Sequence, residues 1–189
     1  MVTGSCLPTA TWGKVMAGSA LNDPMKTAPI PSFDAQRVAA LRDLLILDTP
    51  PEERFDRLVS FVAEEFDVPI ALISLIDENR QWSKSKVGLQ ACEMRRDISF
   101  CAHALTSSSF LLIEDALEDE RFHDNPLVIE PPFIRFYCGA PLTLPSGFVV
   151  GTLCLIDTKP RQMDKLDLAI LGSVRDLVLN ELQGVLGNA

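Results

Sequence analysis

One stretch of the chain constrains the fold more than any other. Residues Ile70–Ile76 read IALISLI, apolar at nearly every position and partly β-branched. Such a run is typical of a central strand whose two faces are both covered. It is too short for a membrane-spanning helix, which needs about 20 apolar residues. The rest of the chain must therefore supply structure on both faces of a sheet.

The segments before this strand have the periodicity of amphipathic helices. The first helix is predicted to begin at Asp34, and Arg37 lies among the polar residues between its apolar positions. The second follows Thr49, its predicted N-cap, with Glu52 completing a capping box, and ends near Phe66. Both helices are expected to place an apolar stripe against the core.

The C-terminal segment, residues 163 to about 186, is predicted as a long helix with two apolar stripes. Leu166 and Leu177 belong to one stripe, and Val178 belongs to the other. One stripe can cover the sheet, which leaves the second for a partner. We therefore predict a homodimer through the terminal helices, disrupted by Val178→Glu.

Further apolar runs predict the remaining strands: residues 80–87, 110–113, 133–144 and 148–156. The order of elements indicates an α+β fold with a mostly antiparallel sheet and the terminal helices on one face. Residues 1–33 mix Gly, Pro, Ser and Thr without period and are predicted as a disordered tail. Residues 34–186 are expected to form one domain.

Charge and cysteine content exclude several functions. The net charge of −9 and the acidic isoelectric point, near 4.7, repel phosphate backbones, so we expect neither nucleic-acid nor membrane binding. The first residues lack a secretory signal, which favours a cytoplasmic protein. Five cysteines without a CxxC pair are expected to be reduced thiols.

Six strings, in this order, resemble the GAF family, in its bacterial branch found alone or ahead of histidine kinase and diguanylate cyclase domains. They are ILDTP (46–50), IDENRQW (76–82), SFCAHA (99–104), DERFHDNPLV (119–128), RFYCGAPL (135–142) and GTLCLID (151–157). The resemblance implies a six-stranded antiparallel sheet. The first, second and last helices would lie on one face, and the polar middle segment would cover a pocket on the other.

The same resemblance implies a small-molecule-binding sensory or regulatory module of bacterial signal transduction, which binds and does not catalyse. A histidine kinase or diguanylate cyclase is the implied signalling partner. No cofactor is expected, because Cys101-Ala102-His103 departs from the Cys-His pair of bilin-binding relatives. A ligand-free dimerisation module is an alternative.

Candidate ligand-binding residues lie in the segments expected around the pocket. They are Ser99, Cys101, His103, Asp115, Arg121, Arg135, Tyr137 and Cys138. The first three belong to a predicted helix, in which Cys101 also fits a small buried hydrophobe. Arg121 either makes a turn or pairs with Asp115 or Asp119. Alternation along the strand places Arg135 and Tyr137 on one face and Cys138 on the other; if the first pair faces the cavity, an anionic or polar ligand is favoured.

A thiol enzyme is the second alternative. Cys92, Cys101 and Cys138 are similar to the cysteines of free methionine-R-sulfoxide reductases, which are GAF enzymes. Cys138 departs from that pattern, because it lies in a predicted strand and not in a loop over the pocket. His103 and His123 lack the spacing of zinc ligands, so no metal site is expected.

Overall fold

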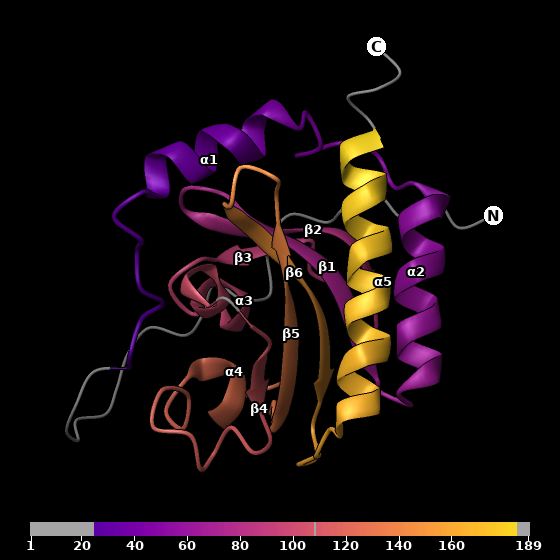
Figure 1. Ribbon diagram of the computed structural model, residues 1–189. Coiled ribbons are helices and arrows are strands. Elements are labelled where there is room, and N and C mark those ends of the chain that lie inside the picture. The colour runs from indigo at the N-terminus through magenta and orange to yellow at the C-terminus, as the bar shows by residue number, and fades with distance from the viewer. Residues whose placement is uncertain (1–24, 108, 185–189) are drawn as a thin grey trace.

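A six-stranded antiparallel sheet forms the middle layer of the protein, as the computed structural model shows for residues 25–107 and 109–184 (Figure 1). Its strand order is β3-β2-β1-β6-β5-β4. The bounds are β1 Ile70–Ile76, β2 Arg80–Val87, β3 Glu93–Arg95, β4 Leu111–Ile113, β5 Phe136–Thr143 and β6 Val149–Asp157. The predicted α+β class with six antiparallel strands is confirmed.

The centre of the sheet is the apolar run that the sequence predicted. Every residue of β1 is buried, and the strand pairs with β2 on one side and β6 on the other. Hairpins join β1 to β2 and β5 to β6. The second turn contains Gly147 at φ 85°, a left-handed conformation that favours glycine.

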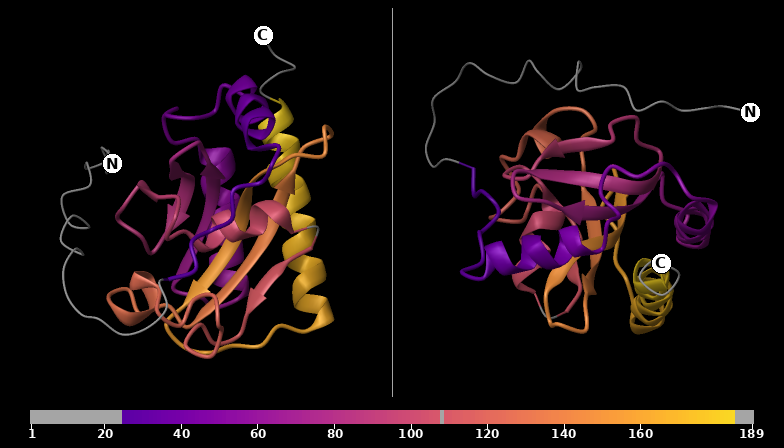
Figure 2. Two further views of the ribbon diagram at one scale, coloured as in Figure 1. Left: turned by 90° about the vertical axis from the view of Figure 1, so that its left-hand side faces the viewer. Right: turned by 90° about the horizontal axis from the view of Figure 1, so that it is seen from above.

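Helices cover both faces of this sheet. Their bounds are α1 Asp34–Asp43, α2 Glu53–Glu65, α3 Phe100–His103, α4 Pro126–Ile129 and α5 Lys165–Gly184, with a short 3-10 helix, η1, at Ala104–Thr106. The long helices α2 and α5 lie side by side on one face, and α3 and α4 lie on the other (Figure 1). Helix α1 crosses one end of the sheet (Figure 2).

The sheet separates two apolar cores. The helix-side core joins α2 and α5 to alternate residues of the central strands, among them Ile73 and Cys138. The lid-side core lies under residues 97–107 and 114–135, which we call the lid; they include α3, η1 and α4. Tyr137 and Cys154 belong to this second core. Successive strand residues thus serve opposite cores, as strand geometry requires.

The start of the second helix differs from the prediction. Helix α2 begins at Glu53 with Glu52 as N-cap, and Thr49 instead donates its hydroxyl to the Ile46 carbonyl at 2.7 Å. The reason lies in the Pro50-Pro51 pair, because a residue before proline is kept out of the helical conformation. The predicted capping box was therefore wrong, although the predicted helix is confirmed.

Other boundaries also shift. Strand β5 begins at Phe136, because Phe133 adopts φ 57° and turns the chain before the strand starts. Strand β3 did not appear in the residue pattern, since it is a short polar edge strand. Within the part of the chain that the structure describes, no helix has the length and hydropathy of a membrane span.

The predictions for the two ends of the chain fall partly outside the described residues. Residues 1–24 of the predicted tail and residues 185 and 186 of the last helix lie there. Within the described residues, Ala28 is buried, and its amide donates to the Asp97 carbonyl at 3.3 Å. The domain boundary at residue 34 stays a prediction.

Candidate functional site

Two buried side chains cap the N-termini of the lid helices. Ser99 caps α3, accepting from the Ala102 amide at 3.0 Å, and its hydroxyl donates to Gln81 on β2. Asn125 caps α4, accepting from the Leu127 amide at 2.9 Å. Short polar side chains suit helix N-termini, where backbone amides lack partners. The predicted helix around Cys101 is confirmed, and the sheet anchors it through Gln81.

A small, partly open cavity of about 30 Å³ lies beneath the lid. Its walls are mainly apolar side chains, and its polar side chains are Gln81, Cys101 and Tyr137. No charged side chain lines it. A buried water needs about 10–15 Å³, whereas pockets for small organic ligands measure about 300–1,000 Å³. The lid therefore lies closed on the sheet, and a larger guest enters only if the lid moves.

Hydroxyl and thiol groups cluster at the sheet surface next to this cavity. The Tyr137 hydroxyl lies 3.5 Å from Thr152 Oγ1, which lies 3.0 Å from Ser74 Oγ. Gly139 makes room for the Tyr137 ring, because a β-carbon there would lie 2.3 Å from the Tyr137 hydroxyl. Burial raises the pKa of Tyr137 well above its usual value, so its phenol is neutral at physiological pH.

His103 lies at the edge of the lid. Its ring meets Phe122 edge-on at 4.6 Å between ring centroids, and its buried Nε2 atom has no hydrogen-bond partner within the described residues. Burial and the positive charge of Arg121 lower the pKa of His103 to about 4. The imidazole is therefore neutral at pH 7.

Two arginines of the predicted site make ion pairs and do not line the cavity. Arg135 pairs with Asp115, with 2.6 Å between Nε and Oδ1. Arg121 pairs with Asp119, with 2.9 Å between Nε and Oδ1, and so takes one of its two predicted partners. Since Arg135 lies outside the cavity while Tyr137 lines it, the condition for an anionic ligand is not met.

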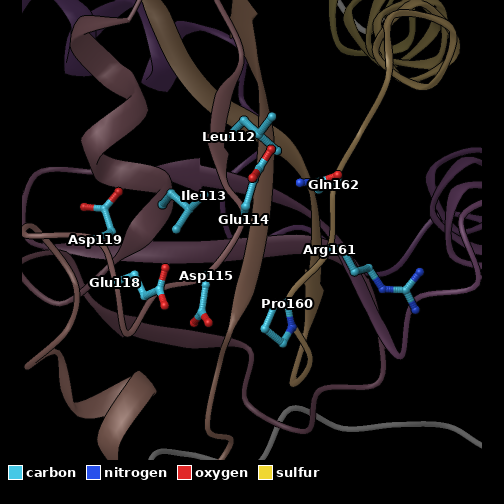
Figure 3. A pocket seen from close by; sticks show the side chains of 9 residues that line it. All are labelled: Leu112, Ile113, Glu114, Asp115, Glu118, Asp119, Pro160, Arg161 and Gln162. Carbon is cyan, nitrogen blue, oxygen red and sulfur yellow. The ribbon is translucent and has the colours of Figure 1, made fainter.

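A second hollow is an open groove of about 620 Å³ at the edge of the sheet. Asp115, Glu118 and Asp119 lie along one side of it, whereas the side chain of Arg161 points away from them (Figure 3). Arg161 instead pairs with Asp157 at 2.6 Å. Within the described residues, no group of three or more His, Cys, Asp or Glu side chains is arranged to hold a metal ion.

The structure does not bring the three cysteines of the thiol-enzyme alternative together. Cys101 is buried in the lid-side core, and Cys138 is buried on the opposite face of the sheet. Burial and the nearby Asp167 raise the pKa of Cys138 to about 12. Cys92 is disulfide-bonded, so the expectation of reduced thiols was wrong for it, whereas Cys101, Cys138 and Cys154 are free.

Several polar residues near the cavity escaped the sequence analysis. Gln81 accepts the hydrogen bond that Ser99 of the lid donates. Ser74 and Thr152 form the hydroxyl cluster with Tyr137. Ser74 and Thr152 carried a usable signal in the sequence, because each stands among the apolar residues of a strand. The structure buries both completely. A buried polar side chain requires a partner, and these two are partners of each other.

Comparison with known proteins identifies relatives of this chain. The family model described as GAF domain matches residues 50–182. A cyclic di-GMP phosphodiesterase of Pseudomonas aeruginosa is 38% identical over 156 residues, which cover 82% of this chain and 27% of the relative. The chain thus spans about a quarter of that relative.

Two solved structures share the fold. The GAF domain from an Acinetobacter phosphoenolpyruvate-protein phosphotransferase has a TM-score of 0.58 and 18% identity, covering 82% of this chain and 98% of its own. A free methionine-R-sulfoxide reductase from Neisseria meningitidis has a TM-score of 0.60 and 14% identity, covering 87% and 100%. At these identities the likeness concerns the fold alone.

One expectation needs correction in the light of these relatives. The family resemblance implied a protein that binds and does not catalyse. The Pseudomonas relative is named as an enzyme, a cyclic di-GMP phosphodiesterase, and this contradicts the prediction. The resemblance had pointed only to the GAF module, whereas the relative extends well beyond the part that this chain matches.

Proposed function

The chain belongs to the GAF domain family, and we propose that it is a small-molecule-binding regulatory module of a bacterial signalling protein that hydrolyses cyclic di-GMP. The similarity to the Pseudomonas phosphodiesterase supports cyclic di-GMP hydrolysis as the regulated activity. The closed lid over a cavity with polar groups supports the choice of a binding site. The ligand-binding residues within the cavity would be Cys101 and Tyr137, with Ser99 acting through Gln81.

The closed lid is the observation that carries this proposal. Because the cavity measures only about 30 Å³, an organic ligand enters only a state in which α3 and α4 have moved. Such a ligand binds the open state better than the closed one and shifts the population between them. The shared sheet connects the lid to α2 and α5, so this shift can reach an output domain.

The cavity lining also suggests the chemistry of the ligand. Its side chains carry no charge, and Gln81, Cys101 and Tyr137 supply its polar contacts. Moving a charged ligand into such surroundings without a partner costs several kcal/mol, roughly, by desolvation. We therefore propose a neutral, mainly apolar ligand with one or two hydrogen-bonding groups.

Neighbouring residues of β1 provide a matched pair of variants for a test. Leu72 lines the cavity, whereas Ile73 faces the helix-side core, so Leu72→Phe fills the ligand site and Ile73→Phe does not. Both overpack a buried position, at a cost of about 1–3 kcal/mol. Native mass spectrometry of freshly purified protein is expected to show a noncovalent ligand that Leu72→Phe alone loses. Absence of a bound mass, together with no thermal stabilisation by neutral metabolites, contradicts the proposal.

Cyclic di-GMP hydrolysis by the full-length protein tests the proposed output. The rate is expected to change when the identified ligand is added, and Leu72→Phe should abolish that response. The Ile73→Phe variant should keep it, because its added volume lies on the other face of the sheet. If the ligand does not change the rate of hydrolysis by the unmodified protein, regulation through the lid is contradicted.

A ligand-free dimerisation module is a second candidate, and the small cavity favours it. Side chains of the protein itself, among them Phe100 and Tyr137, occupy most of the space under the lid. On the helical layer, Leu166 and Leu177 of α5 and Phe61 of α2 are exposed. Under this proposal the protein contributes an interface, and the same mass-spectrometric measurement finds no ligand.

A further inference from the structure

Two cysteine thiols meet where the lid contacts the centre of the sheet. Cys101 belongs to α3, Cys154 belongs to β6, and their sulfur atoms lie 3.7 Å apart. Both side chains are buried and both thiols are free. A disulfide requires sulfur atoms about 2.05 Å apart, so a small approach of α3 toward β6 joins them. The pair is therefore positioned to link the lid to the sheet.

The polar groups around this pair favour an ionised Cys101. Burial alone raises the pKa of its thiol, but hydrogen bonds from Cys154, Ser74, Thr152 and Tyr137 outweigh burial and lower it. Burial and the neighbouring Cys101 raise the pKa of Cys154. The proton of the pair thus stays on Cys154, which leaves Cys101 as the nucleophile.

The cavity beneath the lid provides room for a small oxidant. Cys101 lines this space of about 30 Å³. Since one water needs about 10–15 Å³, the space accommodates a molecule of two oxygen atoms, the size of hydrogen peroxide. A larger oxidant does not fit this space unless the lid moves. A peroxide in this space would lie next to one of the two thiols.

We propose that Cys101 and Cys154 are a redox modification site, at which hydrogen peroxide converts two thiols into a disulfide that fastens the lid to β6. This proposal concerns the lid alone and does not require a ligand beneath it. It differs from the thiol-enzyme alternative, because it uses Cys154 on the central strand and neither Cys92 nor Cys138.

The reaction balances in two steps. The Cys101 thiolate attacks one peroxide oxygen, so an S–O bond forms and the O–O bond breaks; the leaving hydroxide takes up the proton that Cys101 released and becomes water. The Cys154 sulfur then attacks the resulting sulfenic acid, so the S–S bond forms and the S–O bond breaks. The Cys154 proton leaves with the hydroxyl group as a second water. In total two thiols lose two electrons, and one peroxide accepts them.

Peptide mapping of the intact protein tests this site. The purified protein is treated with enough hydrogen peroxide to oxidise free cysteine in the same buffer, and remaining thiols are then alkylated under denaturing conditions. We expect a peptide pair linked between Cys101 and Cys154, which dithiothreitol separates. The proposal is overturned if both residues are recovered as alkylated thiols, or if either links only to another cysteine.

Three variants test whether Cys101 reacts with the peroxide before Cys154 reacts with Cys101. Cys154→Ala should accumulate a sulfenic acid on Cys101 that dimedone traps, whereas Cys101→Ala should give neither the sulfenic acid nor the disulfide. Cys138→Ala, on the opposite face of the sheet, is the matched control and should retain the linked pair. Circular dichroism checks that each variant is folded. A sulfenic acid on Cys154 in the Cys101→Ala variant contradicts the assigned nucleophile.

Amide hydrogen exchange reports the effect on the lid without relying on a variant. Amides of α3 exchange through local opening, so a covalent link to β6 should slow them by about tenfold or more. Amides of α5, which lies on the other face, should change little. Equal exchange of α3 before and after disulfide formation shows that the bond does not fasten the lid and overturns that part of the proposal.

Discussion

His103 makes the stability of the lid depend on pH. Burial beside Phe122 and Arg121 lowers its pKa to about 4, whereas an unfolded histidine has a pKa of about 6.5. Between these values the unfolded chain binds a proton that the folded chain does not. The stability contributed by neutral His103 is therefore complete above about pH 6.5 and is lost as the pH falls toward 4.

Replacement of His103 by Gln should remove this pH dependence. We expect the unmodified protein to lose about 1 kcal/mol of unfolding free energy between pH 7 and pH 5, after allowance for solvent screening of a partly exposed ring. His103→Gln should lose less. Urea denaturation at both pH values measures the difference, to which the carboxylates, common to both proteins, contribute equally.

The matched control for that measurement is His123→Gln. His123 lies in the same lid but is exposed to solvent, so its replacement should leave the pH dependence unchanged. Equal slopes for the unmodified protein and His103→Gln would show that His103 is not the responsible group.

At the scale of elements, α1 is attached to the sheet by a buried ion-pair network. Arg37 is completely buried and donates to the Ile76 carbonyl at the end of β1 and to Asp34 at 2.7 Å. Asp34 also accepts from Arg96, at 2.6 Å and 2.9 Å. One carboxylate thus pairs with two buried guanidinium groups from different parts of the chain.

Substitution of Asp34 by Asn should release α1. It removes the carboxylate that pairs with both buried arginines, Arg37 and Arg96, and breaking such a pair costs roughly 3 kcal/mol. Urea unfolding is expected to show this loss. The matched control is Glu53→Gln, which breaks the exposed Glu53–Arg57 pair and should have little effect. Equal stability of the two variants would contradict the network's importance.

Strands and long helices could be predicted from the sequence, whereas much of the site could not. The stripe containing Val178 faces the helix-side core, and Leu166 and Leu177 remain exposed, as two stripes on one helix implied. Which stripe faces outward was misjudged, because both are apolar and only packing distinguishes them. Val178→Glu would therefore disturb the core and cannot test a dimer interface.

At the scale of the whole molecule, the exposed stripe of α5 remains our predicted dimer interface. Leu177→Glu should convert a dimer to a monomer, because a charge in an apolar interface must be desolvated. Light scattering after size-exclusion chromatography measures the change. Gln183→Glu adds the same charge on another face of α5 and should leave the dimer intact. A monomer in the unmodified protein at high concentration contradicts the prediction.

Local patterns in the sequence determined the sheet, the long helices and the family. An alternation or a three-to-four spacing reports which side of an element is buried, and IALISLI reports a strand buried on both sides. The residues that form each of these patterns lie within a few positions of one another. The elements could therefore be predicted without knowing which other elements pack against them.

Only the tertiary structure decided which predicted site residues meet. Tyr137 and Cys101 face the cavity, Cys138 faces the opposite core, and Arg135 turns to Asp115 outside it. Contacts such as Cys101–Cys154 join residues 53 positions apart, which no local pattern records. The size of the cavity is likewise what remains between closely packed side chains from several elements, so it depends on the completed packing.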